Sequence, residues 1–394
     1  MIYAGVDIAK MDHVIDAVDD KGNKVAKPMG FKNTEAGFER CVAWLEGVAE
    51  DPGEVFVGME STGHYWMACF AYLMARGYKV AVINPMQVKA MRRLKSMPRV
   101  KNDRIDSWLI AEVLRMGDFD VTRLATDEVQ SLKMLTRYRQ QLKQEQAAVK
   151  TQLICVLDAY FPEYADVFGK KGLFGAGSLA VLERCPTPAE CGKVRASTLA
   201  KVLSEASRGR HGAERAADVK AAAKASVGIT LGQDAASYQI KTMVGQIKSL
   251  EETVAEVTAK IGLLLQQVEP LVLTIPGVST ATGAQIVAEI GDVARFKSAA
   301  AVVSYAGLNS GVSQSGQFEA KGEPITKHGS PYLRRAMWLA ADGARKKDPA
   351  LKAFYEKKRG EGKCHRVAVT AVARKLCHIV YAVMRDQVPY DPDR

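Results

Sequence analysis

Residues 101–106 read Lys-Asn-Asp-Arg-Ile-Asp, and they lie where a basic stretch meets two carboxylates. Residues 86–102 carry six Lys and Arg and no Asp or Glu. Asp103 and Asp106 then follow at the predicted start of a helix, where residues three apart lie on one face. Both side chains can therefore point at one cation. A cationic track that leads to hard oxygen ligands is what metal-assisted phosphodiester chemistry needs.

The residues before this stretch predict a mixed α/β domain over residues 1–118. We expect strands at 2–8, 13–18, 24–31, 54–60 and 79–83, and helices at 34–45, 65–76 and 103–115. Three strands, a helix, a strand, a helix, a strand and a helix is the order of a ribonuclease H-like fold. In that fold the first and fourth strands are neighbours, so Asp7 and Glu60 are expected to meet. The last helix should bring Asp103 and Asp106 to the same point.

Four carboxylates at one point repel each other unless cations neutralise them, which predicts Mg²⁺ as the cofactor. Two such ions, about 3.5–4 Å apart, can activate an attacking oxygen and stabilise a leaving one. Structural roles stay open for three of the acids. Asp103 and Asp106 can favour a helix N-terminus through its dipole, and Glu60 can cap the helix that follows. Asp7 is harder to explain this way, because burying an unpaired carboxylate in an apolar strand is costly.

The charge distribution predicts a polyanionic partner. The chain has 394 residues and a net charge of +11, and residues 321–394 contain 17 Lys and Arg against 8 Asp and Glu. A basic surplus confined to one segment favours nucleic acid over a membrane surface. We expect no signal peptide and no membrane span, and the seven cysteines lack zinc-site spacing. A cytoplasmic protein with reduced, structural thiols is the resulting expectation.

The middle segment, residues 119–268, predicts long helices that serve assembly. One helix begins near Asp127, and a second spans about 237–268 with apolar residues repeating every seven positions. Such heptads favour a coiled coil, either between these two helices or with copies from another subunit, which suggests a homo-oligomer. Between the helices, residues 207–212 read Ser-Arg-Gly-Arg-His-Gly. They can form a phosphate-contacting loop or an exposed turn.

The C-terminal segment, residues 269–394, predicts a mainly helical domain. Residues 275–278 read Ile-Pro-Gly-Val before a helix, which is typical of a helix-hairpin-helix start and equally of an ordinary capped helix. A loop rich in Ser and Gly follows at 309–317, flanked by Lys and Arg. Such a loop can present a hydroxyl to a phosphate. On residue chemistry alone Ser310, Ser313 and Ser315 are equivalent.

The chain resembles insertion-sequence transposases that combine an N-terminal RuvC-like DEDD domain with a C-terminal serine domain. Members of that family act as RNA-guided bridge recombinases. The resembling stretches include Gly5-Val6-Asp7, residues 60–65, residues 101–106, Gln314-Ser315-Gly316 and residues 325–335. Two positions depart from the usual pattern, since Asn102 replaces the common Thr and Ser107 the common Ala. Neither is an expected metal ligand.

The resemblance implies a bacterial DNA transposase that cuts and rejoins DNA through a covalent serine link. Asp7, Glu60, Asp103 and Asp106 would bind the metal, and Ser315 would be the nucleophile. Donor and target DNA, a non-coding bridge RNA and further copies of the chain, as a dimer or tetramer, would be its partners. The residues expected to contact nucleic acid are Arg92, Arg93, Lys95, Arg99, Lys101, Arg104, Lys327, Arg334 and Arg335.

Two other functions compete with this interpretation. The first is a Mg²⁺-dependent nuclease or junction resolvase that uses only the four carboxylates. The second is a non-catalytic nucleic-acid-binding scaffold built on the coiled coil.

Overall fold

The computed structural model describes residues 1–61, 63–96, 102–117, 126–311, 314–315, 318–319 and 324–392. The chain divides into two compact units, Met1–Leu124 and Ala125–Arg394. The second unit contains both the middle and the C-terminal segments that the sequence suggests as separate domains.

The first unit contains a mixed five-stranded sheet in the order β3-β2-β1-β4-β5. The strands are β1 (Ile2–Asp7), β2 (Asp12–Val18), β3 (Met29–Lys32), β4 (Val55–Glu60) and β5 (Lys79–Ile83). β1 pairs antiparallel with β2 and parallel with β4, as expected for the first and fourth strands. β3 is shorter than predicted: it begins only after Pro28, which has no N–H to donate to a neighbouring strand.

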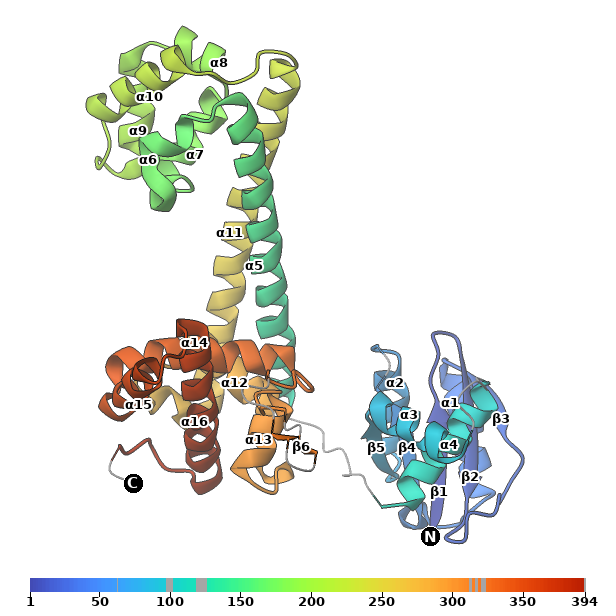
Figure 1. Cartoon of the computed structure of the whole chain (residues 1–394). Helices are drawn as coiled ribbons and strands as arrows, with labels where there is room; N and C mark the ends of the chain where they lie inside the picture. Colours follow the sequence, from blue (N-terminus) through green and yellow to red (C-terminus); the bar gives the residue numbers. More distant parts are fainter. Residues whose placement is uncertain are drawn as a thin grey trace. The chain divides into compact units, whose positions relative to one another are not determined.

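Helices cover both faces of this sheet (Figure 1). Side chains of α1 (Glu35–Glu46) and α2 (Trp66–Met74) share a core with Ala4 and Val6 of β1. On the other face, α3 (Pro85–Leu94) and α4 (Asp103–Arg115) pack together and against Tyr3 and Phe56. This alternation along β1 is the two-residue period of a strand buried on both faces.

Helix α3 was not predicted from the sequence. The side chain of Asn84 accepts a hydrogen bond from Met86 N–H, and Gln87 reaches back to the Asn84 backbone N–H in a capping box. Pro85 occupies the first helical position, where its missing N–H costs nothing. Lys89, Arg92 and Arg93 of the basic stretch therefore lie on a helix rather than in a loop.

The second unit is built on two long helices, α5 (Asp127–Tyr160) and α11 (Gln233–Val268), that lie side by side (Figure 1). They run antiparallel, because Leu132 and Leu142 of early α5 share a core with Val257 and Ile261 of late α11. The apolar heptad positions Ile240, Ile247, Val254 and Ile261 are buried. Within one chain, the two helices therefore use their apolar seams on each other.

Five helices that the sequence did not predict pack at the far end of this pair. They are α6 (Tyr164–Gly172), α7 (Ala176–Arg184), α8 (Pro188–Lys193), α9 (Ala196–Ser207) and α10 (Ala213–Ala225). Their core joins Leu153 and Leu157 of α5 to Ile240 of α11. Residues 207–212 form the turn between α9 and α10, where the Ser207 hydroxyl accepts a hydrogen bond from His211 N–H at 2.9 Å.

The C-terminal part of the second unit is helical around one core. It comprises α12 (Thr280–Ile290), α13 (Ala299–Tyr305), α14 (Pro331–Lys347), α15 (Pro349–Gly360) and α16 (His365–Asp386), and the short hairpin β6 (Gln314–Ser315) and β7 (Phe318–Glu319). The Ile-Pro-Gly-Val turn follows a 3-10 turn at Leu271–Thr274. Its Gly277 packs against the backbone of α14, where a Cβ would lie 2.3 Å from Ala344 N.

Among the described residues, one helix is long and apolar enough to cross a bilayer, namely α16. Seven of its residues, from Val369 to Val383, are buried in the C-terminal core. That burial is typical of a core helix.

Gly5→Ala should destabilise the first unit by about 2 kcal/mol or more, because a Cβ at Gly5 would lie 2.0 Å from Ser107 O and 2.5 Å from Ala111 N. Both atoms belong to the backbone of α4, so the whole helix must move. Gly30→Ala is the matched control, since its nearest neighbour would be 3.9 Å away. Denaturant titration of both variants measures the difference. Equal midpoints for the two variants would contradict this packing.

Candidate active site

Two of the predicted acids lie at one end of the sheet. Asp7 and Glu60 are the last residues of β1 and β4, which run parallel and are paired up to Val6 and Met59. Both carboxylates are partly exposed. The carboxyl ends of adjacent parallel strands therefore deliver two acids to the same edge, as the sequence predicts.

Helix α4 brings the other two acids to this edge. Gly5 of β1 contacts the α4 backbone at Ser107 and Ala111, whereas the last residue of α4, Arg115, lies near Gly22, in the turn that follows β2. Val18, the last residue of β2, pairs with Tyr3 at the start of β1, so α4 begins near the end of β1. Its first turn carries Asp103, which is exposed, and Asp106, which is buried. Asn102, one of the two departures from the pattern of the resembling transposases, caps this turn by accepting from Arg104 N–H at 2.9 Å.

The four acids share one end of the unit without being gathered around one point. Among the described residues, which include all four, no group of three or more His, Cys, Asp and Glu side chains is placed to hold a metal ion. Asp106 instead forms an ion pair with Arg92 of α3. Carboxylate oxygens suit a hard divalent cation, but this ion pair has to open before Asp106 can serve as a ligand.

The basic residues of the first unit differ in their availability to a partner. Lys95 lies 2.6 Å from the buried carboxylate of Glu112 and stacks over Trp108, so it stabilises α4 in addition to any contact with nucleic acid. Arg93 and Arg104 are exposed. The remaining two predicted contacts, Arg99 and Lys101, lie outside the described residues.

The turn after Asp7 is held by a buried histidine. His13 of β2 is fully buried and its Nδ1 accepts a hydrogen bond from Ala9 N–H at 3.3 Å. Its ring packs edge-on to Phe31 and parallel to Phe38. Burial among these rings lowers the pKa of His13, which keeps the imidazole neutral and able to accept.

In the second unit, Ser315 lies in the short hairpin, opposite Phe318. Ser313 lies outside the described residues. Ser310 forms a bridge to Ile325 at the base of the hairpin, and its hydroxyl accepts a hydrogen bond from Arg374 at 3.1 Å. Ser310 is therefore engaged with helix α16.

Of the three basic residues predicted beside this hairpin, two are exposed and one is used inside the fold. Lys327 and Arg335 are exposed. The Arg334 guanidinium donates to the carbonyl oxygens of Ala306 and Lys327, both at 3.1 Å, and so closes the base of the hairpin. Its predicted role in binding nucleic acid competes with this structural one.

Sequence reasoning missed three further cations near these elements. Arg374 of α16 contacts the hairpin base through Ser310. Burial, and then the nearby Arg335, lower the pKa of Arg139 on α5. Burial, and then Lys150 and Arg139, lower the pKa of Lys143 one turn further along. Arg139 donates to the Thr258 hydroxyl of α11 at 2.8 Å and Lys143 donates to Gln146 at 3.1 Å, so both cations also serve contacts within the helix pair. Only the helical register of α5 could have indicated that they lie in one row.

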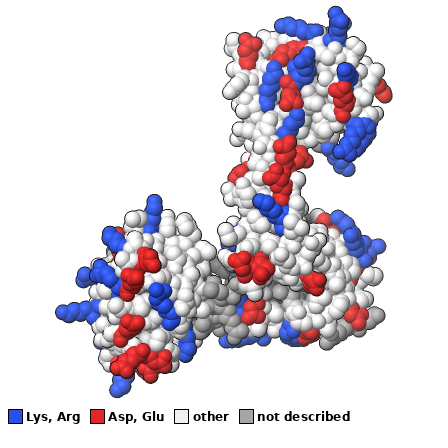
Figure 2. Space-filling view, turned by 180° about the vertical axis from the view of Figure 1, so that it is seen from behind, with Lys and Arg blue, Asp and Glu red and all other residues white. Residues whose placement is uncertain are grey.

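The outer edge of the C-terminal helices is also basic. Figure 2 shows Lys and Arg side chains gathered there, over the part of the unit formed by α14 to α16. The exposed Lys and Arg residues of α14 and α15 include Lys346, Lys347, Lys352, Lys357 and Arg359. The surplus of positive charge in residues 321–394 is thus displayed on the surface.

Comparison with known proteins gives two family matches. Residues 4–162 match a model described as a transposase with a DEDD domain of the IS110 type. Residues 269–356 match a model described as a transposase of the IS116/IS110/IS902 family.

Several relatives are similar over nearly the whole chain. The 43.6 kDa protein of insertion element IS110 from Streptomyces coelicolor is 26% identical over 99% of this chain and 95% of its own length. The mini-circle putative transposase for IS117 from the same organism is 24% identical over 100% and 96%. The pilin gene-inverting protein of Moraxella bovis is 23% identical over 99% and 97%.

The first unit should lose stability as the pH falls below about 6.5, the usual pKa of a histidine. His13 has a lowered pKa in the folded state, so its contribution is complete above that pH and declines as protons favour the unfolded chain. Trp338→Phe leaves Trp44, Trp66 and Trp108, whose fluorescence reports on this unit alone. Denaturant midpoints at pH 7.5 and 5.5 measure the change. In that background, His13→Gln should flatten the dependence, and an unchanged slope would show that His13 is not its source.

Proposed function

We propose that this chain, which belongs to the IS110/IS116 family of transposases, cuts and rejoins DNA through two centres. One centre is a divalent-cation site formed by Asp7, Glu60, Asp103 and Asp106. The other is the hydroxyl of Ser315, which acts as the nucleophile. Enzymes of this family cut and rejoin DNA, so the proposal concerns the groups that do so and their partners.

The observation that carries the proposal is the position of the four acids at one end of the first unit. Asp7 and Glu60 end adjacent parallel strands, and α4 begins at the same end of the sheet with Asp103 and Asp106 in its first turn. The strand order and the helix across β1 and β4 support a ribonuclease H-like domain. A cation bound between these acids would balance the repulsion that arises if their carboxylates close on one point, which would give the arrangement a purpose beyond folding.

Mg²⁺ is the proposed cation, because four carboxylates offer the hard oxygen ligands that it prefers. When bound, it would supply charge neutralisation at a phosphodiester and lower the pKa of an attacking group. Arg92 neutralises Asp106 in the absence of the cation. That ion pair compensates the buried charge of the Asp106 carboxylate. Once the pair opens, the Arg92 guanidinium becomes available to a phosphate.

The proposed covalent step conserves the energy of the phosphodiester. The Ser315 oxygen attacks the phosphorus, a new P–O bond forms, and the bond to one deoxyribose oxygen breaks. The serine proton is lost to a base or to solvent, and the departing sugar oxygen takes up a proton. Attack by a strand-end hydroxyl on the phosphoserine then reverses these changes, which rejoins DNA and restores the serine. Lys327, which is exposed at the hairpin base, and Arg374, which contacts Ser310 there, would neutralise the phosphate.

The proposed partners are donor and target DNA, a non-coding bridge RNA and further copies of the chain. The basic surface of α14 to α16 supports a polyanionic ligand. One relative is named for a mini-circle and another for inverting a pilin gene, and both names describe moved or reoriented DNA. Such a protein would act in the bacterial cytoplasm, at the nucleoid. Because α5 and α11 cover each other's seams, assembly would use other surfaces.

Ser315→Ala should abolish both strand exchange and the covalent protein–DNA adduct, whereas Ser313→Ala should keep at least half of each. Both changes remove a single hydroxyl from the same loop, so the pair is matched. The assay follows a labelled DNA substrate with Mg²⁺ and the co-purifying RNA, and detects the adduct on denaturing gels. Continued cutting by Ser315→Ala would favour the carboxylate-only nuclease. Unchanged recombination by Asp7→Asn would exclude the cation site altogether.

A further inference from the structure

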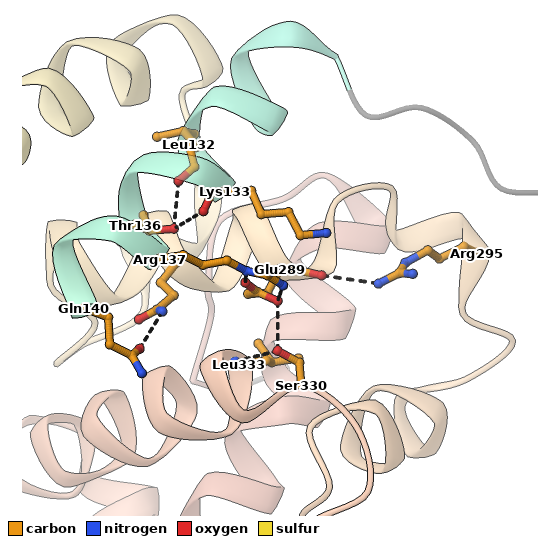
Figure 3. A network of polar contacts seen from close by, with 10 residues as sticks. Leu132, Lys133, Thr136, Arg137, Gln140, Glu289, Arg295, Ser330 and Leu333 are labelled. Carbon is orange, nitrogen blue, oxygen red and sulfur yellow. Dashed lines mark hydrogen bonds and ion pairs between the residues drawn. The ribbon is translucent and has the colours of Figure 1, made fainter. Parts of the chain in front are cut away.

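One buried carboxylate joins three helices of the second unit. Glu289 lies near the end of α12 and is 1% exposed. Arg137 of α5 donates to both of its oxygens, from Nε at 2.6 Å and from Nη2 at 2.9 Å. The Ser330 hydroxyl, at the start of α14, donates to Oε2 at 2.8 Å. Figure 3 shows these side chains pointing toward one another from the three helices.

The surroundings of Glu289 hold each partner in place. The Arg137 guanidinium stacks over the Tyr332 ring, 4.5 Å from its centroid. Ser330 caps α14 by accepting from Leu333 N–H at 3.1 Å while it donates to Glu289. Arg295 donates to the backbone carbonyl of Glu289 at 3.2 Å. The carboxylate is thus fully compensated, which a buried charge needs in order to persist.

Ser330 also ends the arm that leads out of the Ser315 hairpin. Residues 324–330 run beside residues 305–311 and are joined to them by four backbone hydrogen bonds of 2.7–3.1 Å. The last of these links Ser330 N–H to the Tyr305 carbonyl at 2.7 Å. Gly329 adopts φ +114 and lies so close to Tyr305 that a Cβ would be 2.1 Å from its carbonyl oxygen. The base of the hairpin therefore consists of two closely joined segments, and Ser330 lies at the end of the second.

A purely stabilising role explains this arrangement less well. Replacing a buried ion pair by apolar residues is often neutral or stabilising, so stability alone does not require a charge here. One turn earlier on α12, Gln285 already joins α12 to α5, because it donates to Gln140 at 2.9 Å. What Glu289 adds is the bond to Ser330, and hence a link between α5 and the hairpin base.

We propose that Glu289 is a positioning residue, which fixes the base of the hairpin that carries Ser315 to helix α5 through Arg137 and Ser330. This inference rests on the proposed function of Ser315. It gives the carboxylate a role in catalysis without contact to DNA, since its oxygens are occupied by Arg137 and Ser330. A displacement of about 1 Å at a reacting group can cost on the order of 100-fold in rate.

The experiment compares Glu289→Met with Gln285→Met in the full-length protein. Both variants place the same side chain on the same buried face of α12, one turn apart, and both remove a polar contact to α5. Only Glu289→Met removes the acceptor of Ser330. Two readouts are needed: hydrogen exchange of peptides that cover residues 305–311 and 324–333, and the rate of covalent adduct formation at saturating DNA.

We expect Glu289→Met to exchange at least tenfold faster in both peptides and to form the adduct 10- to 100-fold more slowly. Its DNA affinity should stay within threefold of the wild type, because no DNA contact is removed. Gln285→Met should resemble the wild type in both readouts. Glu289→Gln, which keeps one acceptor oxygen, should lie between them and replaces Glu289→Met if that variant fails to fold.

Equal behaviour of Glu289→Met and Gln285→Met would overturn the inference, since it would reduce Glu289 to one more contact between α5 and α12. Wild-type exchange and adduct rates in Glu289→Met would overturn it as well. A wild-type protein that forms no adduct contradicts the proposed role of Ser315. In that case the exchange readout still tests whether Glu289 holds the hairpin base.

Discussion

The candidate site of the first unit depends on the close approach of helix α4 to strand β1. Because Gly5 has no side chain, the helix lies against β1 nearly backbone to backbone, and Gly58 of β4 leaves room for the side chains of Ile110 and Leu114. This contact fixes where α4 begins, and therefore where Asp103 and Asp106 lie relative to the ends of β1 and β4. The buried charge of Asp106 is balanced by Arg92, which α3 supplies from the same face of the sheet.

In the second unit, a buried charge at Glu289 has the positioning role that the close contact at Gly5 has in the first unit. Its long helices α5 and α11 pack along a mainly apolar seam, and this packing holds them together without setting the position of the hairpin base. Glu289 sets that position, because its two oxygens accept from α5 and from the start of α14. A buried charge tolerates little displacement of its partners, so it locates elements more sharply than apolar packing does.

Local patterns in the sequence predicted most elements of the sheet, helix α4 and the heptads of α11. They missed α3, although Asn84, Pro85 and Gln87 form a recognisable capping box, and they missed the short Ala-rich helices α6 to α10. The acids Asp7 and Glu60 were foreseeable because strand order places them together. The contacts of Arg92 with Asp106 and of Arg137 with Glu289 were not foreseeable. In each pair the partners lie on different helices, and Arg137 and Glu289 are separated by 152 residues. Contacts of that kind arise from tertiary packing and leave no periodic signal.

The most direct test of the account is the binding of Mn²⁺, a spectroscopic substitute for Mg²⁺, to the full-length protein by electron paramagnetic resonance. If Asp7, Glu60, Asp103 and Asp106 serve one site, then Asp7→Asn, Glu60→Gln, Asp103→Asn and Asp106→Asn should each weaken binding at least tenfold. Glu54→Gln, an exposed acid just before β4 and at the opposite end of that strand, should leave binding unchanged. Four variants that bind Mn²⁺ as the wild type does would contradict the central claim that these acids form a cation site.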